Sequence, residues 1–229
     1  MDFSFLDKYF PYFLSGTGIT IMISIVTVIL GTGIGLLMAL LKLSKKKPLN
    51  VLANVYIEVL RGTPMLLQIT IGFLLLQGFF PSKDLEVGVL TVDLGRLLPG
   101  MIVLSLNSGA YVAEIIRGGI LAVNNGQTEA SYSLGLRPAQ TMRYVILPQA
   151  LRNILPPLGN EFITLIKDSS LLTAIGINEL MGAAQIVISN SYVPLEPYFI
   201  AAAVYFIMTF ATSRLLNRWE KRLGKGYQG

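Results

Sequence analysis

A single predicted helix carries several polar side chains on one of its faces. The apolar run from Ile154 to Ile175 is interrupted by charged and amide-bearing residues. At about 100° per residue, the polar residues fall within about a third of the helix circumference. They are Asn160, Glu161, Thr164, Lys167 and Asp168. Ionisable groups in such an apolar helix are costly unless they pair or face water, and they commonly mark a substrate path.

These side chains suit a ligand that carries both a positive and a negative charge. A zwitterion needs an acceptor for its ammonium group and a donor for its carboxylate, and Glu161 and Asn160 could supply them. Glu58, beside an expected helix break at Pro64, could add a second acceptor, because a broken helix end offers free backbone groups. Gln185, on a small or polar helical stripe, is a further candidate.

Two of these groups also have a structural interpretation. Lys167 and Asp168 could form an internal ion pair that fixes helix packing. Glu58 and Arg61 are three residues apart and could neutralise each other. Both interpretations stay open at the level of the sequence.

Two other spaced pairs are interpreted as structural. Glu114 and Arg117 have ion-pair spacing near the end of an apolar run. Gly31 and Gly35 form a small-xxx-small pair, which is typical of helix packing in membranes.

Composition indicates which solvent surrounds these helices. Of the 229 residues, 53% are hydrophobic and 14% are charged, whereas soluble domains carry about 25% charged residues. The chain contains no cysteine and no histidine, which excludes thiol and imidazole catalysis and most zinc sites. We therefore expect a membrane protein with no catalytic residue and no metal. The net charge of +5 comes from bases between apolar runs, so nucleic acid is not an expected partner.

Five apolar runs are long enough to cross a bilayer, which takes about 20 residues. They are Gly16–Leu41, Val51–Phe80, Leu97–Ile116, Ile154–Ile175 and Tyr198–Leu216. Because Pro64 lies inside the second run, that helix should bend or break there. The segment Asn178–Ser189 is expected to be a short helix against the bundle and not a sixth span. The predicted fold class is an all-α membrane protein with five transmembrane helices in one domain, residues 1–229.

Basic residues predict the orientation of these spans, because cytoplasmic loops are enriched in Lys and Arg. With the amino terminus outside, thirteen of the 18 basic residues lie inside, three lie outside and two lie within spans. We therefore expect the carboxyl terminus to be cytoplasmic. Membrane lipid is an expected partner of the basic segment from Arg214 to Lys225.

A polar cytoplasmic connection, residues 124–148, has the pattern of two short helices. Gly135 is a suitable helix C-cap, and Pro138 suits the first turn of the second helix. A helix pair this short buries little apolar surface by itself, so it should dock on another protein.

This connection resembles the cytoplasmic signature loop of ABC-importer permeases. The usual form of that loop is EAA, three residues, Gly, nine residues and I-x-LP, and this sequence has Glu129-Ala130, Gly135 and Val145-x-Leu147-Pro148. It departs in having Ser131 at the third alanine position and Val145 at the isoleucine position. Three further segments resemble the polar amino acid branch of the family. They are Glu58 to Pro64 (E-x-x-RGTP), Ala110 to Gln127, and Gly159 to Leu171.

The resemblance implies a fold similar to type I ABC importer permeases, in the cytoplasmic (inner) membrane of a prokaryote. It also implies a second permease copy forming a homodimer, two ATP-binding cassette subunits that hold ATP and Mg, and an extracytoplasmic solute-binding protein. The chain has no GxxxxGK[ST] loop, so ATP hydrolysis is expected on those separate subunits. The residues implied in ATPase coupling are Glu129, Ala130, Gly135, Leu136, Arg137, Leu147 and Pro148.

A count of charges in or near the spans suggests the substrate. The acids are Glu58, Glu114, Glu161, Asp168 and Glu179, and the bases are Arg61, Arg117 and Lys167. Two acids are in excess, which favours a basic amino acid such as arginine, lysine or histidine. The alternative is glutamine or another neutral polar amino acid, with the spare acids balanced across a dimer, by protonation or by water.

Two other classes of protein compete with this interpretation. A secondary transporter or channel would need no ATPase, but the sequence has no evident inverted repeat, and its cytoplasmic helix pair needs a partner. An intramembrane enzyme would need paired carboxylates or Ser/Lys chemistry, and no suitable arrangement is evident.

Overall fold

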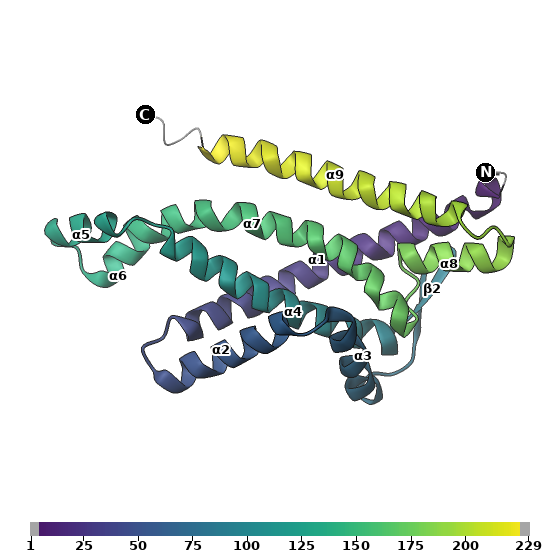
Figure 1. Cartoon of the computed structure of the whole chain (residues 1–229), viewed down its shortest axis with the longest axis horizontal. Helices are drawn as coiled ribbons and strands as arrows, with labels where there is room; N and C mark the ends of the chain where they lie inside the picture. Colours follow the sequence, from purple (N-terminus) through teal and green to yellow (C-terminus); the bar gives the residue numbers. More distant parts are fainter. Residues whose placement is uncertain (1–4, 225–229) are drawn as a thin grey trace.

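Long helices running side by side form the body of the protein (Figure 1). The computed structural model describes residues 5–224, with side chains for residues 5–220. Within this described part, three helices are each long and apolar enough to span a membrane, namely α1 (Leu6–Lys42), α4 (Leu94–Leu121) and α9 (Glu196–Gly224). Helix α1 packs along α4, which in turn packs along α7 (Leu147–Asp168).

The second predicted span is broken where the sequence indicated. Helix α2 (Lys47–Gly62) and helix α3 (Met65–Leu76) meet at a bend of 112°. The two residues between them, Thr63 and Pro64, have extended backbone conformations, and a proline cannot donate the hydrogen bond that would continue the helix. A short 3-10 turn, η1 (Gln77–Phe79), follows α3.

A second bent element completes the set of spans. Helix α7 continues through η3 (Ser169–Ile175) and meets α8 (Leu180–Ser191) at 49°. The bend follows Gly176, whose φ of 81° is the left-handed conformation that glycine adopts without a steric cost. If each bent pair is one span, the described residues contain five spans. Helix α8, a short helix packed on α1 and α9, is then not a sixth span, as predicted for Asn178–Ser189.

A β-hairpin departs from the all-helical prediction. Strand β1 (Asp84–Val87) pairs antiparallel with β2 (Leu90–Asp93) across a turn at Gly88. Leu90 and Val92 point into the core while Thr91 is exposed, so the segment has the two-residue period of a strand. The hairpin lies at the same end of the molecule as the amino terminus and α8 (Figure 1).

The polar connection folds as a helix pair at the opposite end (Figure 1). Helix α5 (Asn125–Ser133) is followed by α6 (Pro138–Thr141) and a π-helical turn, η2 (Met142–Ile146). Gly135 has a φ of 80° in the turn between the helices, and Pro138 begins α6. The predicted helix–turn–helix is confirmed.

Glycine allows α1 and α4 to approach closely. A β-carbon placed at Gly35 would lie 2.6 Å from Cβ of Val112, and one at Gly31 would lie 2.8 Å from Oγ of Ser108. Any larger residue would force the helices apart. The prediction that these glycines serve helix packing is confirmed.

Two of the three apolar clusters among the described residues divide the length of α4. Leu104 and Leu172 belong to one cluster, whereas Ala113 and Ile154 belong to the other. On α4 the buried Asn107 lies between Leu104 and Ala113. A polar layer therefore separates the two clusters, at the depth where the α2–α3 break occurs.

Candidate functional site

A cavity of about 280 Å³ lies in this polar layer. Its lining residues come from the α2–α3 break, α4 and α7, and they are Thr63, Met65, Asn107, Tyr111, Glu161, Thr164, Leu165 and Asp168. We call this space the first cavity. Three of the seven predicted binding residues line it, namely Glu161, Thr164 and Asp168. They are three and four residues apart on α7, so they lie above one another on one helix face.

The opposite wall contains residues that were not among the predicted binding residues. Asn107 and Tyr111 are one helical turn apart on α4, while Thr63 and Met65 flank Pro64. Asn107 could have been recognised from the sequence as a candidate, because it is an amide in an otherwise apolar span. The other three gave no sign of a shared location, since helices far apart in sequence bring them together.

Side-chain amides hold the helix break in place. Gln68 Nε2 donates to the carbonyl oxygens of Leu60 at 2.8 Å and Thr63 at 3.0 Å. Asn107 Nδ2 donates to the Leu60 carbonyl at 3.1 Å and to Oε1 of Gln68 at 2.8 Å. Two carbonyl groups released by the break, those of Leu60 and Thr63, are thus satisfied. Asn107 therefore fixes the cavity wall as well as lining it.

Four predicted binding residues lie outside the described lining of this cavity. Glu58, Asn160, Lys167 and Gln185 are all exposed. Consecutive residues on a helix point about 100° apart, so Asn160 and Lys167 diverge from their neighbours Glu161 and Asp168. Among the described side chains, no ion pair within 4.0 Å joins Lys167 to Asp168.

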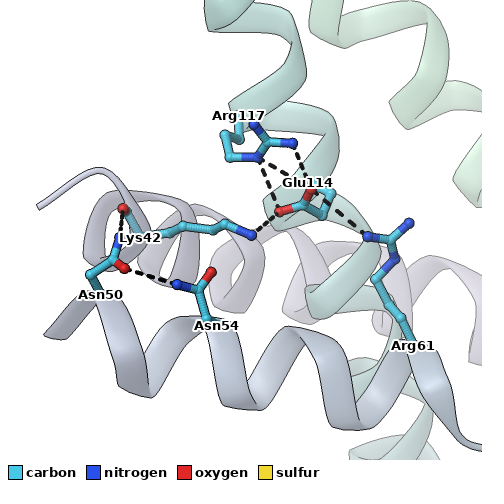
Figure 2. A network of polar contacts seen from close by, with 6 residues as sticks. All are labelled: Lys42, Asn50, Asn54, Arg61, Glu114 and Arg117. Carbon is cyan, nitrogen blue, oxygen red and sulfur yellow. Dashed lines mark hydrogen bonds and ion pairs between the residues drawn. The ribbon is translucent and has the colours of Figure 1, made fainter. Parts of the chain in front are cut away.

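Glu58 and Arg61 likewise form no ion pair within 4.0 Å among the described side chains. Arg61 faces Glu114 of α4 instead, with Nη1 3.8 Å from Oε2. Figure 2 shows Lys42 and Arg117 approaching the same carboxylate. Lys42 Nζ lies 2.7 Å from Oε1 and Arg117 Nη2 lies 2.9 Å from Oε2. The predicted Glu114–Arg117 pair is confirmed, and the structure adds Lys42 and Arg61 to it.

A second cavity, of about 360 Å³, lies beside this cluster. It is lined by Arg61, Tyr111, Glu114, Ile115, Gly118, Gly119, Ala122, Asn153 and Pro157. Tyr111 lines both cavities. The guanidinium carbon of Arg61 lies 5.2 Å from the centre of the Tyr111 ring, within the range of a cation–π contact.

Glu179 has a role that the charge count could not reveal. It is 0% exposed and serves as the N-cap of α8. Its Oε1 accepts from the backbone N–H groups of Met181 and Gly182 at 2.8 and 3.1 Å. Its Oε1 also accepts from Thr173, and its Oε2 accepts from Thr20 and Tyr205. This carboxylate has hydrogen-bond donors for both oxygens and needs no cation, so it is not one of the unpaired acids in the charge count.

The residues implied in ATPase coupling lie on or near the surface of the helix pair. Glu129, Ala130, Gly135, Arg137, Leu147 and Pro148 are exposed, and Leu136 is half-buried. The neighbouring Leu134 is 83% exposed. Ser131, at the third alanine position, is buried and donates to the Gln127 carbonyl at 2.6 Å. The polar hydroxyl of Ser131 is therefore accommodated at a buried position of α5, because it is hydrogen-bonded.

The family model described as "Binding-protein-dependent transport system inner membrane component" matches residues 31–225. The chain belongs to this family. It is thus a multi-pass permease of the inner membrane, within the polar amino acid group of ABC importers.

Several proteins are similar to this permease over nearly its whole length. A putative glutamine transport system permease protein GlnP of Rickettsia felis is 38% identical, covering 96% of this chain and 98% of its own. The arginine transport system permease protein ArtQ of Bacillus subtilis is 36% identical, covering 97% of both chains. A solved chain described as "Crystal structure of an amino acid ABC transporter with histidines" is 44% identical. It has a TM-score of 0.88 and covers 97% of this chain and 99% of that chain. The predicted ABC importer permease fold is confirmed.

Proposed function

We propose that this permease is the membrane-spanning subunit of an ATP-driven importer for basic amino acids, and that the first cavity binds the substrate. The charge of the cavity carries the proposal. Glu161 and Asp168 line it, and none of the described lining residues is a lysine or an arginine. The chain has no histidine. Carboxylates at membrane depth need a counter-charge, and a cationic ligand supplies one.

A basic amino acid matches this cavity in charge and size. A neutral amino acid brings one ammonium group, whereas arginine or lysine brings a second cation and so offers one to each carboxylate. The volume of about 280 Å³ is just below the range of about 300–1,000 Å³ typical of drug-sized ligands. A single amino acid is therefore a suitable occupant.

The similar proteins are named for two classes of substrate, basic and neutral polar amino acids. The Bacillus subtilis relative is named for arginine transport, and the solved relative is described with histidines. Other relatives are named for glutamine transport, which favours the alternative of a neutral polar amino acid. In that case Glu161 or Asp168 would be protonated or balanced by a second copy.

The rest of the proposed assembly is supported by the family to which the chain belongs, by the helix pair and, for the orientation, by the charge distribution. Two separate ATP-binding subunits, which hold ATP and Mg and carry out hydrolysis, dock on residues 124–148. Exposed apolar side chains such as Leu134 and Tyr144 give them a surface to cover. A solute-binding protein delivers substrate from outside, and a second copy of this single-domain chain completes a homodimer. The amino terminus lies outside and the carboxyl terminus inside.

The test is Glu161→Gln, which keeps the side-chain shape and removes the charge. Uptake of labelled arginine is measured in proteoliposomes that hold the complete transporter. We expect a fall of about tenfold, equivalent to about 1.4 kcal/mol, while binding of arginine to the external receptor is unchanged. Glu58→Gln is the matched control, because Glu58 is exposed and is not among the described lining residues.

The control should transport arginine at the wild-type rate. If Glu161→Gln also transports arginine normally, the carboxylate is structural and the proposal of a cationic substrate fails.

A further inference from the structure

Three basic residues surround a single carboxylate beside the candidate site (Figure 2). Lys42, Arg61 and Arg117 come from α1, α2 and α4, and all three lie within 4.0 Å of Glu114. One negative charge cannot neutralise three positive charges. The cluster therefore has an excess of positive charge, which an anion can balance.

Arg61 is the least engaged of the three bases. Lys42 and Arg117 approach Glu114 to 2.7 and 2.9 Å, which are hydrogen-bond distances, whereas Arg61 stays 3.8 Å away. Its side chain is 41% exposed. A planar guanidinium group can bind a carboxylate through two parallel hydrogen bonds. Arg61 is therefore the member of the cluster that is best able to accept another anion.

The position of Arg61 connects this excess charge with the substrate site. Arg61 lines the second cavity and lies over Tyr111, which lines both cavities. Thr63, two residues further along the chain, lines the first cavity. The guanidinium group thus lies in the second cavity, beside the tyrosine that the two cavities share.

Every amino acid substrate carries a carboxylate that the first cavity does not neutralise. None of the described lining residues of that cavity is basic. We propose that Arg61 binds the α-carboxylate of the transported amino acid beside the tyrosine that the two cavities share. This inference rests on the proposed function, but the α-carboxylate is common to basic and neutral amino acids.

The experiment compares two ligands that differ in the carboxylate alone. L-arginine and agmatine, which is arginine without its carboxylate, are titrated against the purified permease–ATPase complex in nanodiscs without the solute receptor. In the wild type, arginine should bind at least about tenfold more tightly than agmatine. Arg61→Met should weaken arginine binding until it matches agmatine binding, and it should leave agmatine binding unchanged. Arg61→Lys should retain part of the preference, since it keeps the charge.

Lys42→Met is the matched control. Lys42 contacts the same Glu114 carboxylate, but it is not among the described residues that line either cavity. The arginine-to-agmatine preference should therefore survive in this variant, and elution as a single complex on size exclusion shows that each variant folds.

Three results would overturn the inference. Equal losses of arginine and agmatine would show that Arg61 is structural or binds a lipid phosphate. If Arg61→Met binds both ligands as tightly as the wild type, Arg61 does not contact the carboxylate. If Lys42→Met lowers the arginine-to-agmatine preference as much as Arg61→Met does, the effect arises from the disturbed Glu114 carboxylate. If the wild type binds glutamine and not arginine, the proposed substrate fails separately. The same comparison is then made with glutamine and 4-aminobutanamide, its decarboxylated analogue.

Discussion

Replacement of Glu179 should separate the need for hydrogen-bond acceptors from the need for a charge. Glu179→Leu removes both oxygens and leaves the N–H groups of Met181 and Gly182 buried without their acceptor. Each such group costs about 1–3 kcal/mol, so we expect a loss of about 4 kcal/mol. The hydroxyl groups of Thr20 and Tyr205 can rotate, so they add less.

Glu179→Gln should be much milder. Its amide oxygen can replace Oε1 and keep both backbone hydrogen bonds, while its NH₂ group can donate to the hydroxyls that now face Oε2. What is lost is the attraction between a negative charge and the amino-terminal end of α8, about 0.3–1 kcal/mol.

The assay is the apparent melting temperature of the detergent-solubilised protein, followed by size exclusion. At about 2–4 °C per kcal/mol for a chain of this size, Glu179→Leu should melt about 8–16 °C lower and Glu179→Gln about 1–4 °C lower. Glu58→Leu and Glu58→Gln are the controls on an exposed carboxylate and should melt near the wild type. If the Gln variant melts as low as the Leu variant, the charge is essential and the assignment of Glu179 as a satisfied cap is wrong. If the Leu variant melts like the wild type, the hydrogen bonds contribute no stability.

Two further predictions concern coupling and topology. Gly135→Asp should insert normally but lose substrate-stimulated ATP hydrolysis, because its φ of 80° strains a residue with a side chain; normal stimulation would remove this turn from the coupling surface. Cysteines introduced at Ser82 and at Lys46 should react with an impermeant maleimide from opposite faces of sealed cells, Ser82 from outside. Labelling of both from outside would reverse the orientation drawn from the basic residues.

The sequence predicted the elements of the fold better than their contacts. Long apolar runs and the proline at position 64 were sufficient for five spans and for the position of the break, because hydropathy and proline chemistry act locally. The hairpin was missed although its alternation of Leu85 and Val87 around polar residues was visible. A short strand gives a weak signal beside runs of 20 apolar residues.

The candidate site was predicted in part, since it combines one helix face with distant partners. Helical periodicity correctly placed Glu161, Thr164 and Asp168 on one face. It could not show that the other polar residues of that predicted face, Asn160 and Lys167, do not line the cavity. Pairing by sequence spacing joined Arg61 to Glu58. The contact between α2 and α4 instead offers Arg61 a carboxylate 53 positions away, at Glu114. Such long-range contacts are set by helix packing, which no local pattern encodes.

The relative affinity of the membrane site for arginine and glutamine tests the central claim most directly. The purified permease–ATPase complex, without its solute receptor, is titrated with each amino acid at one pH and one salt concentration. Because Glu161 and Asp168 line the first cavity with no basic residue among its described lining, arginine should bind at least about tenfold more tightly than glutamine. Equal affinities, or tighter binding of glutamine, would contradict the account of a cavity built for a cationic amino acid.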